Sequence, residues 1–254
     1  MRTIAEIFSL LQEKAPLEAK MDFDNVGLLA GLPEWETDKV LLSLDITDDV
    51  VSEAGALGVG LVVSHHPMFF QLKSASSLSP EGGRTARLLS QKIAAICMHT
   101  NLDAADGGVN DALAAILGVE GALPFEAEHV ARIGSLPQAM ELQGFLGHVK
   151  EKLSAAGLRY VAGRGPVHRV AVGGGSCGSM LEEAVAAGCD TFVTSDVKYD
   201  TFLRAKELGI SLIDAGHFPT ENVVIPVLAG WLKEAFPELE VLISRHRQTE
   251  QYYV

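Results

Sequence analysis

The run Leu61–Ser64, followed by His65, His66 and Pro67, constrains the fold more than any other stretch of the chain. An apolar run of this length without alternation, closed by a turn signal, is typical of a strand buried on both faces of a parallel sheet. Pro67 ends the strand and restricts His66 to extended geometry. Successive side chains on an extended backbone point in opposite directions. The two imidazoles therefore suit two neighbouring metal ions better than one, and the alternative is a structural histidine pair at a strand end.

Other short apolar runs also end in side chains that bind metals. The runs are Val40–Leu44, Ile93–Met98 and Ile210–Ile213, and the side chains that follow them are Asp45, His99, Asp103 and His217. Residues 47–54 form a predicted helix between two runs, with Thr47 as its N-cap. Such a strand–helix–strand unit implies parallel pairing, and open α/β sheets bind ligands outside the carboxyl ends of their strands. The sequence therefore predicts an α/β fold with His65, His66 and Asp103 on one rim.

The length of 254 residues and a hydrophobic content of 48% leave room for two modest domains. A mixed stretch from residue 124 to residue 137 marks the boundary between them. We expect two interlinked α/β domains with largely parallel sheets. Residues 1–125 with 218–254 form the first domain, and residues 126–217, which lead to His217, form the second.

Composition limits the partners and the compartment. A net charge of −13, from 33 acidic and 20 basic residues, gives no basic surface for nucleic acid or anionic membrane. Three cysteines without a C-x-x-C pair fit a reducing cytoplasm. Residues 1–11 form an amphipathic helix rather than a signal peptide, and no apolar stretch is long enough to span a bilayer. We therefore expect a cytoplasmic protein that acts on a small molecule.

A glycine motif offers a competing interpretation. Gly173, Gly175 and Gly178 match G-x-G-x-x-G between a predicted strand and a predicted helix, and Asp196 ends the next strand at a suitable distance for a ribose contact. The motif is consistent with a dinucleotide site, a phosphate cradle or a tight turn. Because glycine turns between strands and helices are common, the tight turn is favoured.

His217 is followed by its own helix signal. Pro219 fits the first turn of a helix, and Glu221 in that turn can reach back toward His217. Pro226 either kinks this helix or separates a short first turn from the rest. The histidine and the carboxylate alone are compatible with a capping arrangement. Combined with the histidine pair and Asp103, they favour metal binding.

The donor types indicate which metals fit. Three imidazoles and two carboxylates without a thiolate suit zinc, iron, manganese, cobalt or nickel rather than calcium or a cysteine-rich structural zinc site. Five side chains are too many for one catalytic ion with an open position, but they suit two ions that share a bridging carboxylate and a water. We therefore expect two divalent ions and hydrolytic chemistry.

Several motifs together resemble the GTP cyclohydrolase I type 2 family, also called the NGG1-interacting-factor-like family. They are Asp24–Gly27, Ser64–Pro67, His99–Asp103, Ser195–Tyr199 and Gly216–Glu221, so the resemblance covers nearly the whole chain. It implies a two-domain α/β fold, a dinuclear metal site facing the interdomain cleft, and a toroidal homohexamer. The ligands that it implies are His65, His66, Asp103, His217 and Glu221, with Glu221 as the bridge.

The activity that the resemblance implies is hydrolytic opening of the imidazole ring of GTP, with release of formate and formation of dihydroneopterin triphosphate. A metal-dependent phosphoesterase or amidohydrolase would use the same ligands, and a ring-shaped regulatory scaffold without turnover is a further alternative. Many members carry a histidine where this chain has Asp200, which puts the role of that histidine in doubt here. The insertion that some relatives carry between the two halves is absent.

Two further expectations concern catalysis and assembly. His99 precedes Asp103 by four residues and is predicted to transfer protons, with a structural histidine as the alternative. Phe69, Phe70 and the terminal residues 251–254 place bulky apolar groups where a monomer would leave them uncovered. They are expected at an oligomer interface, and a core position is the alternative for either phenylalanine.

Overall fold

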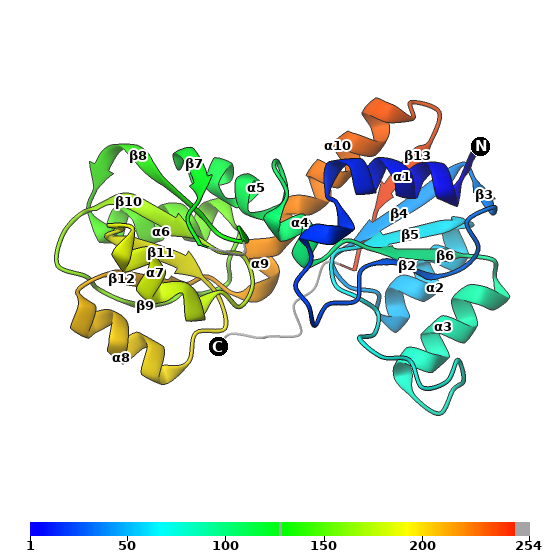
Figure 1. Cartoon of the computed structure of the whole chain (residues 1–254), viewed down its shortest axis with the longest axis horizontal. Coiled ribbons are helices and arrows are strands. Elements are labelled where there is room, and N and C mark those ends of the chain that lie inside the picture. The colour runs from blue at the N-terminus through cyan, green and yellow to red at the C-terminus, as the bar shows by residue number, and fades with distance from the viewer. Residues whose placement is uncertain (127–128, 247–254) are drawn as a thin grey trace. The chain divides into compact units, whose positions relative to one another are not determined.

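The computed structural model describes residues 1–126 and 129–246 (Figure 1). The chain divides into two compact units, which are Met1–Asp106 with the segment that starts at Ile225, and Gly107–Val224. The prediction placed the boundaries at residues 125 and 217. The difference arises because β7 (Glu120–Pro124) pairs with β8 (Arg132–Met140) and therefore belongs to the second unit.

The first unit contains a five-stranded sheet. Its order is β13 (Glu240–Ile243), β4 (Lys39–Ser43), β5 (Leu61–Ser64), β6 (Ala94–Cys97) and β2 (Gly27–Ala30). The first four strands are parallel, and β2 runs antiparallel to β6. Every residue of β5 and β6 is buried, as the unbroken apolar runs predict. A short ribbon of β1 (Arg2–Thr3) and β3 (Glu36–Thr37) accompanies this sheet.

The helices of the first unit accompany its sheet, and some of them begin at a side-chain cap. They are α1 (Ile4–Lys14), η1 (Leu17–Ala19), α2 (Asp48–Leu57), α3 (Pro80–Ser90), α4 (Thr100–Ala104) and α10 (Ile225–Ala235). Thr47 caps α2 as predicted, because its side chain accepts the amide of Val50. Helices α2 and α3 cover the same face of the sheet (Figure 1), where Val51 and Leu88 pack near Val62 of β5.

The second unit contains a six-stranded mixed sheet. Its order is β7, β8, β10 (Val167–Val172), β11 (Thr191–Thr194), β12 (Ser211–Asp214) and β9 (Arg159–Val161). Strands β10, β11 and β12 are parallel, and the outer strands run antiparallel to their neighbours. The parallel strands lie in the middle of the sheet and antiparallel strands extend it on both sides, so this sheet is mixed, whereas largely parallel sheets were predicted.

Both faces of this sheet are covered. The helices are α5 (Val109–Ile116), α6 (Leu142–Lys152), η2 (Gly178–Met180), α7 (Leu181–Ala186), α8 (Tyr199–Leu208), α9 (His217–Glu221) and η3 (Asn222–Val224). Phe145 of α6 packs with Val170 and Val172 of β10, whereas the intervening Ala171 packs on the other face with Leu181 of α7. This alternation follows from the period of two along a strand.

Two α/β units are therefore confirmed. Pro226 lies at the second position of α10, and η3 separates that helix from α9, so the short first turn is separate, as one of the two predicted alternatives required. Within residues 1–126 and 129–246, no helix is long and apolar enough to cross a membrane.

Candidate metal centre

Strands β4, β5 and β6 of the first unit end side by side at the same edge of the sheet. Ser43 pairs with Ser64, and Ser64 pairs with Cys97, so the last residues of the three strands lie in register. The ladder continues one step further, since the amide of Met98 donates to the carbonyl of Ser64 at 2.9 Å. Residues that follow these strands are therefore delivered to one rim, as the parallel topology predicts.

His65 is oriented by the main chain. Its Nδ1 lies 3.0 Å from the carbonyl oxygen of Met98. Because a carbonyl only accepts hydrogen bonds, Nδ1 carries the proton and Nε2 keeps its lone pair. Nε2 lies 3.6 Å from Oδ1 of Asp103, which α4 presents. His65 and Asp103, which were predicted to lie on one rim, are therefore neighbours within the first unit.

His66 and His99 are oriented by carboxylates. Nδ1 of His66 lies 2.8 Å from Oδ1 of Asp45, and Nδ1 of His99 lies 2.8 Å from Oδ1 of Asp24. Such carboxylate contacts fix the tautomer and the direction of a ligating imidazole. The three rings of His65, His66 and His99 have centroids 5.0 to 5.5 Å apart, and one nitrogen of each lies within 4.8 Å of the others.

The carboxyl of Asp24, behind His99, has a strongly lowered pKa. Burial by itself raises the pKa of its carboxyl, but hydrogen bonds from His99 and Thr100 outweigh burial, and the net pKa lies well below the ordinary range. The amide and the hydroxyl of Thr100 donate to Oδ2 at 3.0 and 2.5 Å. Asp24 therefore stays ionised at neutral pH and holds the proton of His99 on Nδ1.

His217 and Glu221 form a pair within the second unit. They lie four residues apart in α9, and Nε2 of His217 is 2.9 Å from Oε2 of Glu221. Nδ1 of the same ring is 2.6 Å from Oδ2 of Asp196. With Nδ1 protonated toward Asp196, the Nε2 lone pair and the Glu221 carboxylate are both acceptors, so a shared proton or metal ion joins them. The predicted reach of Glu221 back to His217 is thus observed.

The glycine motif lies directly against this pair. Gly175 has φ +63°, and a Cβ on it would lie 2.0 Å from Oε1 of Glu221 and 3.2 Å from Nε2 of His217. The amide of Gly174 donates to Oδ1 of Asn110 at 2.7 Å, and that of Gly175 donates to Oγ1 of Thr220 at 3.0 Å. Because a phosphate cradle needs such amides for its ligand, this turn serves instead to make room for Glu221.

Asp196 and Asp214 show why the Asp196 loop is not a ribose contact. Asp196 has φ +52°, in the left-handed region, and its carboxylate turns to His217. Asp214, at the end of β12, accepts the amides of Val197 and Gly216 at 3.0 and 3.1 Å, and Arg159 pairs with it. One buried carboxylate therefore anchors the residues on either side of the His217 contact.

The remaining donors support an oxygen and nitrogen site. Burial raises the pKa of the Cys97 thiol well above its ordinary value and raises the pKa of Cys189 to about 12, while Cys177 donates to the carbonyl of Gly174. Cys97 and Cys189 therefore stay protonated near neutral pH, and the groups of possible metal donors among the described residues contain only histidines and carboxylates. Imidazole and carboxylate donors with oriented rings fit zinc, iron, manganese, cobalt or nickel.

The sequence interpretation found Asp45 and Asp196 at strand ends but did not predict that they orient histidines. The structure pairs Asp45 with His66 and Asp196 with His217. Asp24 carries no such signal, because 75 residues separate it from His99. Asp200, where many family members carry a histidine, lies in the first turn of α8, and its carboxylate accepts a hydrogen bond from the amide of Thr201.

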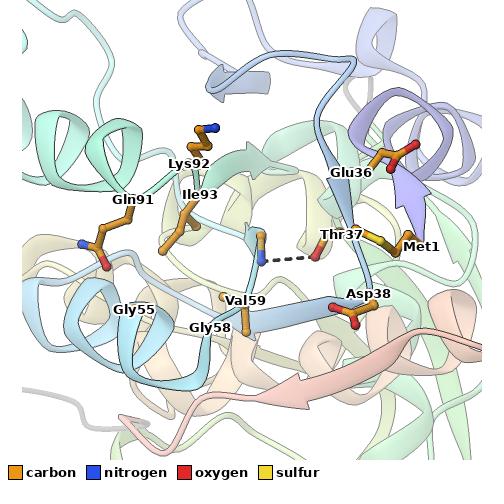
Figure 2. A pocket seen from close by; sticks show the side chains of 11 residues that line it. Met1, Glu36, Thr37, Asp38, Gly55, Gly58, Val59, Gln91, Lys92 and Ile93 are labelled. Atoms are coloured by element: carbon orange, nitrogen blue, oxygen red, sulfur yellow. Dashed lines mark hydrogen bonds between the residues drawn. The ribbon is translucent and has the colours of Figure 1, made fainter.

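A pocket of about 290 Å³ opens elsewhere on the first unit (Figure 2). Its lining includes Thr37, Gly60 and Lys92, and the amide of Gly60 donates to Oγ1 of Thr37 at 3.2 Å. These residues precede strands β4, β5 and β6, so the pocket lies at the opposite edge from the histidines. Ligands of open α/β sheets bind at the carboxyl edge, and the pocket carries no metal-binding group of the kind described above.

The fold and the donors define a two-unit α/β protein with histidine–carboxylate groups that could hold metal ions. The model of the Duf34/NIF3 family (NGG1p interacting factor 3) matches residues 2–250. The chain belongs to this family.

Two curated relatives carry the name GTP cyclohydrolase 1 type 2 homolog. The protein of Clostridium acetobutylicum is 31% identical over 94% of this chain and 92% of its own length. The protein of Streptomyces coelicolor is 31% identical over 97% of this chain and 88% of its own length. Among solved structures, the Bacillus cereus protein related to NIF3 has a TM-score of 0.93 at 23% identity, covering 100% of this chain and 99% of that one. A Staphylococcus aureus protein has a TM-score of 0.90 at 27% identity, with coverage of 100% and 99%.

Proposed function

We propose that the chain holds two divalent metal ions and uses them to hydrolyse a small molecule. The proposed ligands are His65, His66, Asp103, His217 and Glu221, of which Glu221 would bridge the ions. The observation that carries the proposal is the state of the imidazoles, each of which has Nδ1 against an oxygen and therefore presents Nε2 as a donor. Zinc, iron, manganese, cobalt and nickel all suit this set.

Paired divalent ions lower the pKa of a shared water and stabilise negative charge that develops on an oxygen. The residues around them have complementary roles. Asp24 holds the Nδ1 proton of His99, so Nε2 of His99 takes up and returns the proton of the reaction. This is the logic of a histidine oriented by a buried carboxylate.

The specific reaction we propose is that of the relatives' name. GTP would react with water, its imidazole ring would open with loss of formate, and dihydroneopterin triphosphate would form. Support comes from the names of the curated relatives at about 31% identity and from the nitrogen and oxygen donors.

The test combines metal analysis with turnover. Protein purified without added metal is analysed for elements, stripped with a chelator and reloaded with each candidate ion. We expect about two ions per subunit and formate release from GTP that is lost on stripping and restored on reloading. If the protein binds metal and does not turn over GTP, but cleaves a member of a panel of phosphoesters and amides, it is a phosphoesterase or amidohydrolase instead. Metal binding with no turnover of any of these would favour the regulatory scaffold.

We further propose a cytoplasmic homohexamer. The three cysteines are free and buried, which suits a reducing compartment. Phe69 is half-buried and packs on the core of the first unit, so the core alternative holds for it, while Phe70 is exposed. Residues 251–254 lie outside the described residues. Light scattering at micromolar concentration should give a mass near six subunits, and a concentration-independent monomer would reject the ring.

A further inference from the structure

Two phenylalanines next to the histidines of the first unit are exposed to solvent. Phe23 is 64% exposed and Phe70 is 55% exposed. Their ring centroids lie 6.2 Å apart with an interplanar angle of 50°, and the ring of Phe70 lies 6.3 Å from that of His99. Among the described residues, the other exposed aromatic side chains are Tyr160 and Tyr199. Half of the exposed aromatic side chains of the described residues therefore gather at one rim.

The loops that carry the two rings are held together by hydrogen bonds. Nδ2 of Asn25 donates to the carbonyl of Phe69 at 2.9 Å, which ties the loop of Phe23 to the loop of Phe70. The amide of Met21 donates to Oγ1 of Thr100 at 2.9 Å, and Asp24 binds His99. The two rings therefore lie on loops that are joined to each other, and the loop of Phe23 also carries Asp24, which orients His99.

Two exposed phenylalanine side chains are unfavourable on a surface that contacts only water. More than half of each ring remains in water although the two rings touch, so their mutual contact does not account for their placement. Planar heteroaromatic rings stack on exposed aromatic side chains, with an effect of roughly 5- to 150-fold on affinity per ring. Sugars and aliphatic amides lack a flat π face and gain little from such a surface.

We propose that Phe23 and Phe70 form a stacking surface for a planar heteroaromatic ring of the substrate. The surface sets the ring beside His99, so it selects heteroaromatic substrates such as purine nucleotides over aliphatic ones. The inference rests on the proposed hydrolytic function and names the residues that select its substrate class.

Calorimetric titration of the metal-loaded protein tests the proposal. GTP, ATP and FMN serve as probes with a ring, and inorganic triphosphate serves as the probe without one. We expect at least one ring-bearing probe to bind the wild type more tightly than triphosphate. Phe23→Leu and Phe70→Leu should weaken that probe by 5-fold or more while changing triphosphate affinity less than twofold, because leucine keeps the apolar bulk and loses the π face.

The controls separate stacking from other roles. Phe70→Tyr should retain the affinity, and Leu78→Ala, which alters another highly exposed apolar residue of the same unit, should change nothing. Equal binding of every ring-bearing probe and triphosphate by the wild type would overturn the proposal. So would a loss of oligomer mass in the leucine variants with unchanged ring preference, since the rings would then form a subunit contact. The metal content of the same samples reports separately on the proposed function.

Discussion

Both units orient histidines with carboxylates, but only His65 of the first unit has a main-chain carbonyl on its Nδ1. In the first unit, His65 is held by a backbone carbonyl at the end of a buried strand ladder, so its direction follows from the sheet itself. In the second unit, His217 is held by the side chain of Asp196, and its partner Glu221 fits only because Gly175 lacks a Cβ. The contact that orients His65 does not involve a neighbouring side chain, whereas the placement of His217 and Glu221 depends on Asp196 and Gly175. We therefore expect single substitutions to damage the second set of ligands more.

Replacing Glu221 with Gln should have the largest effect. An amide is a weaker metal ligand than a carboxylate, and a bridging residue serves both ions, so occupancy should fall from about two ions per subunit to fewer than one. Elemental analysis of protein purified without added metal measures this. Glu183→Gln, on the exposed side of α7, is the matched control. Full occupancy in the Glu221 variant would reject the bridging role.

His99→Asn should be the next most severe change for turnover. If His99 transfers a proton, the rate should fall by roughly 10²- to 10⁴-fold while the metal content stays at the wild-type level. The exposed His168→Asn serves as the control for loss of an imidazole. A parallel loss of metal would instead make His99 a ligand, which its closeness to His65 and His66 also permits. Unchanged turnover would leave it a structural histidine.

Gly175→Ala should affect the second set of ligands selectively. The added Cβ would meet Oε1 of Glu221 at 2.0 Å, and alanine at φ +63° is strained by about 1–2 kcal/mol. Glu221 must move, so metal affinity should fall by roughly 10- to 100-fold, the size found when the support of a ligand is lost. Gly178→Ala, whose Cβ would have no neighbour nearer than 3.9 Å, is the control from the same motif. Equal affinity in both variants would show that the turn does not set the position of Glu221.

Asp196→Asn and Asp45→Asn compare the carboxylates that orient histidines in the two units. Each change removes the charge behind one imidazole, of His217 or His66, and each should weaken metal binding by about tenfold. The Asp196 variant should be the more severe, because Glu221 beside His217 also depends on the space that Gly175 leaves for it. Competition titrations with a chromogenic chelator give the two affinities. A larger loss in the Asp45 variant would reverse the ranking of the two units.

Much of the fold and of the candidate site could be predicted because the signals are local. The end of a buried apolar run is visible in Leu61–Ser64, and the spacing of four between His217 and Glu221 places both on one helical face. Parallel strands then place their ends on one rim.

The rest depends on contacts that no local pattern records. Asp24 meets His99 across 75 residues, and the space that Gly175 leaves for Glu221 exists only in the folded unit. The boundary at residue 106 differs from the predicted one for the same reason, because antiparallel pairing of β7 with β8 draws the preceding helix into the second unit. Long-range pairing therefore limits what the sequence alone can show.

The smallest expected effect concerns acid stability and again separates the units. The pKa of Asp24 is lowered in the folded state, so the unfolded state binds more protons once the pH falls to about 4, the ordinary value for aspartate. The stabilisation from Asp24 is fully present above that value and is lost as the pH falls toward the folded-state pKa. Asp24→Asn should therefore lower the free energy of unfolding at pH 7 and make it less dependent on pH between about 5 and 3.

Chemical denaturation across this pH range, on metal-stripped protein, measures the difference. Asp196→Asn is the comparison, because Asp196 is exposed and its contact with His217 lies at the surface of the second unit. Its free energy of unfolding at pH 7 should fall less than that of the Asp24 variant. If both variants lost the same pH dependence, the hydrogen bonds from His99 and Thr100 would not be what stabilises ionised Asp24. The orientation of the histidines in the first unit would then have to come from its strands alone.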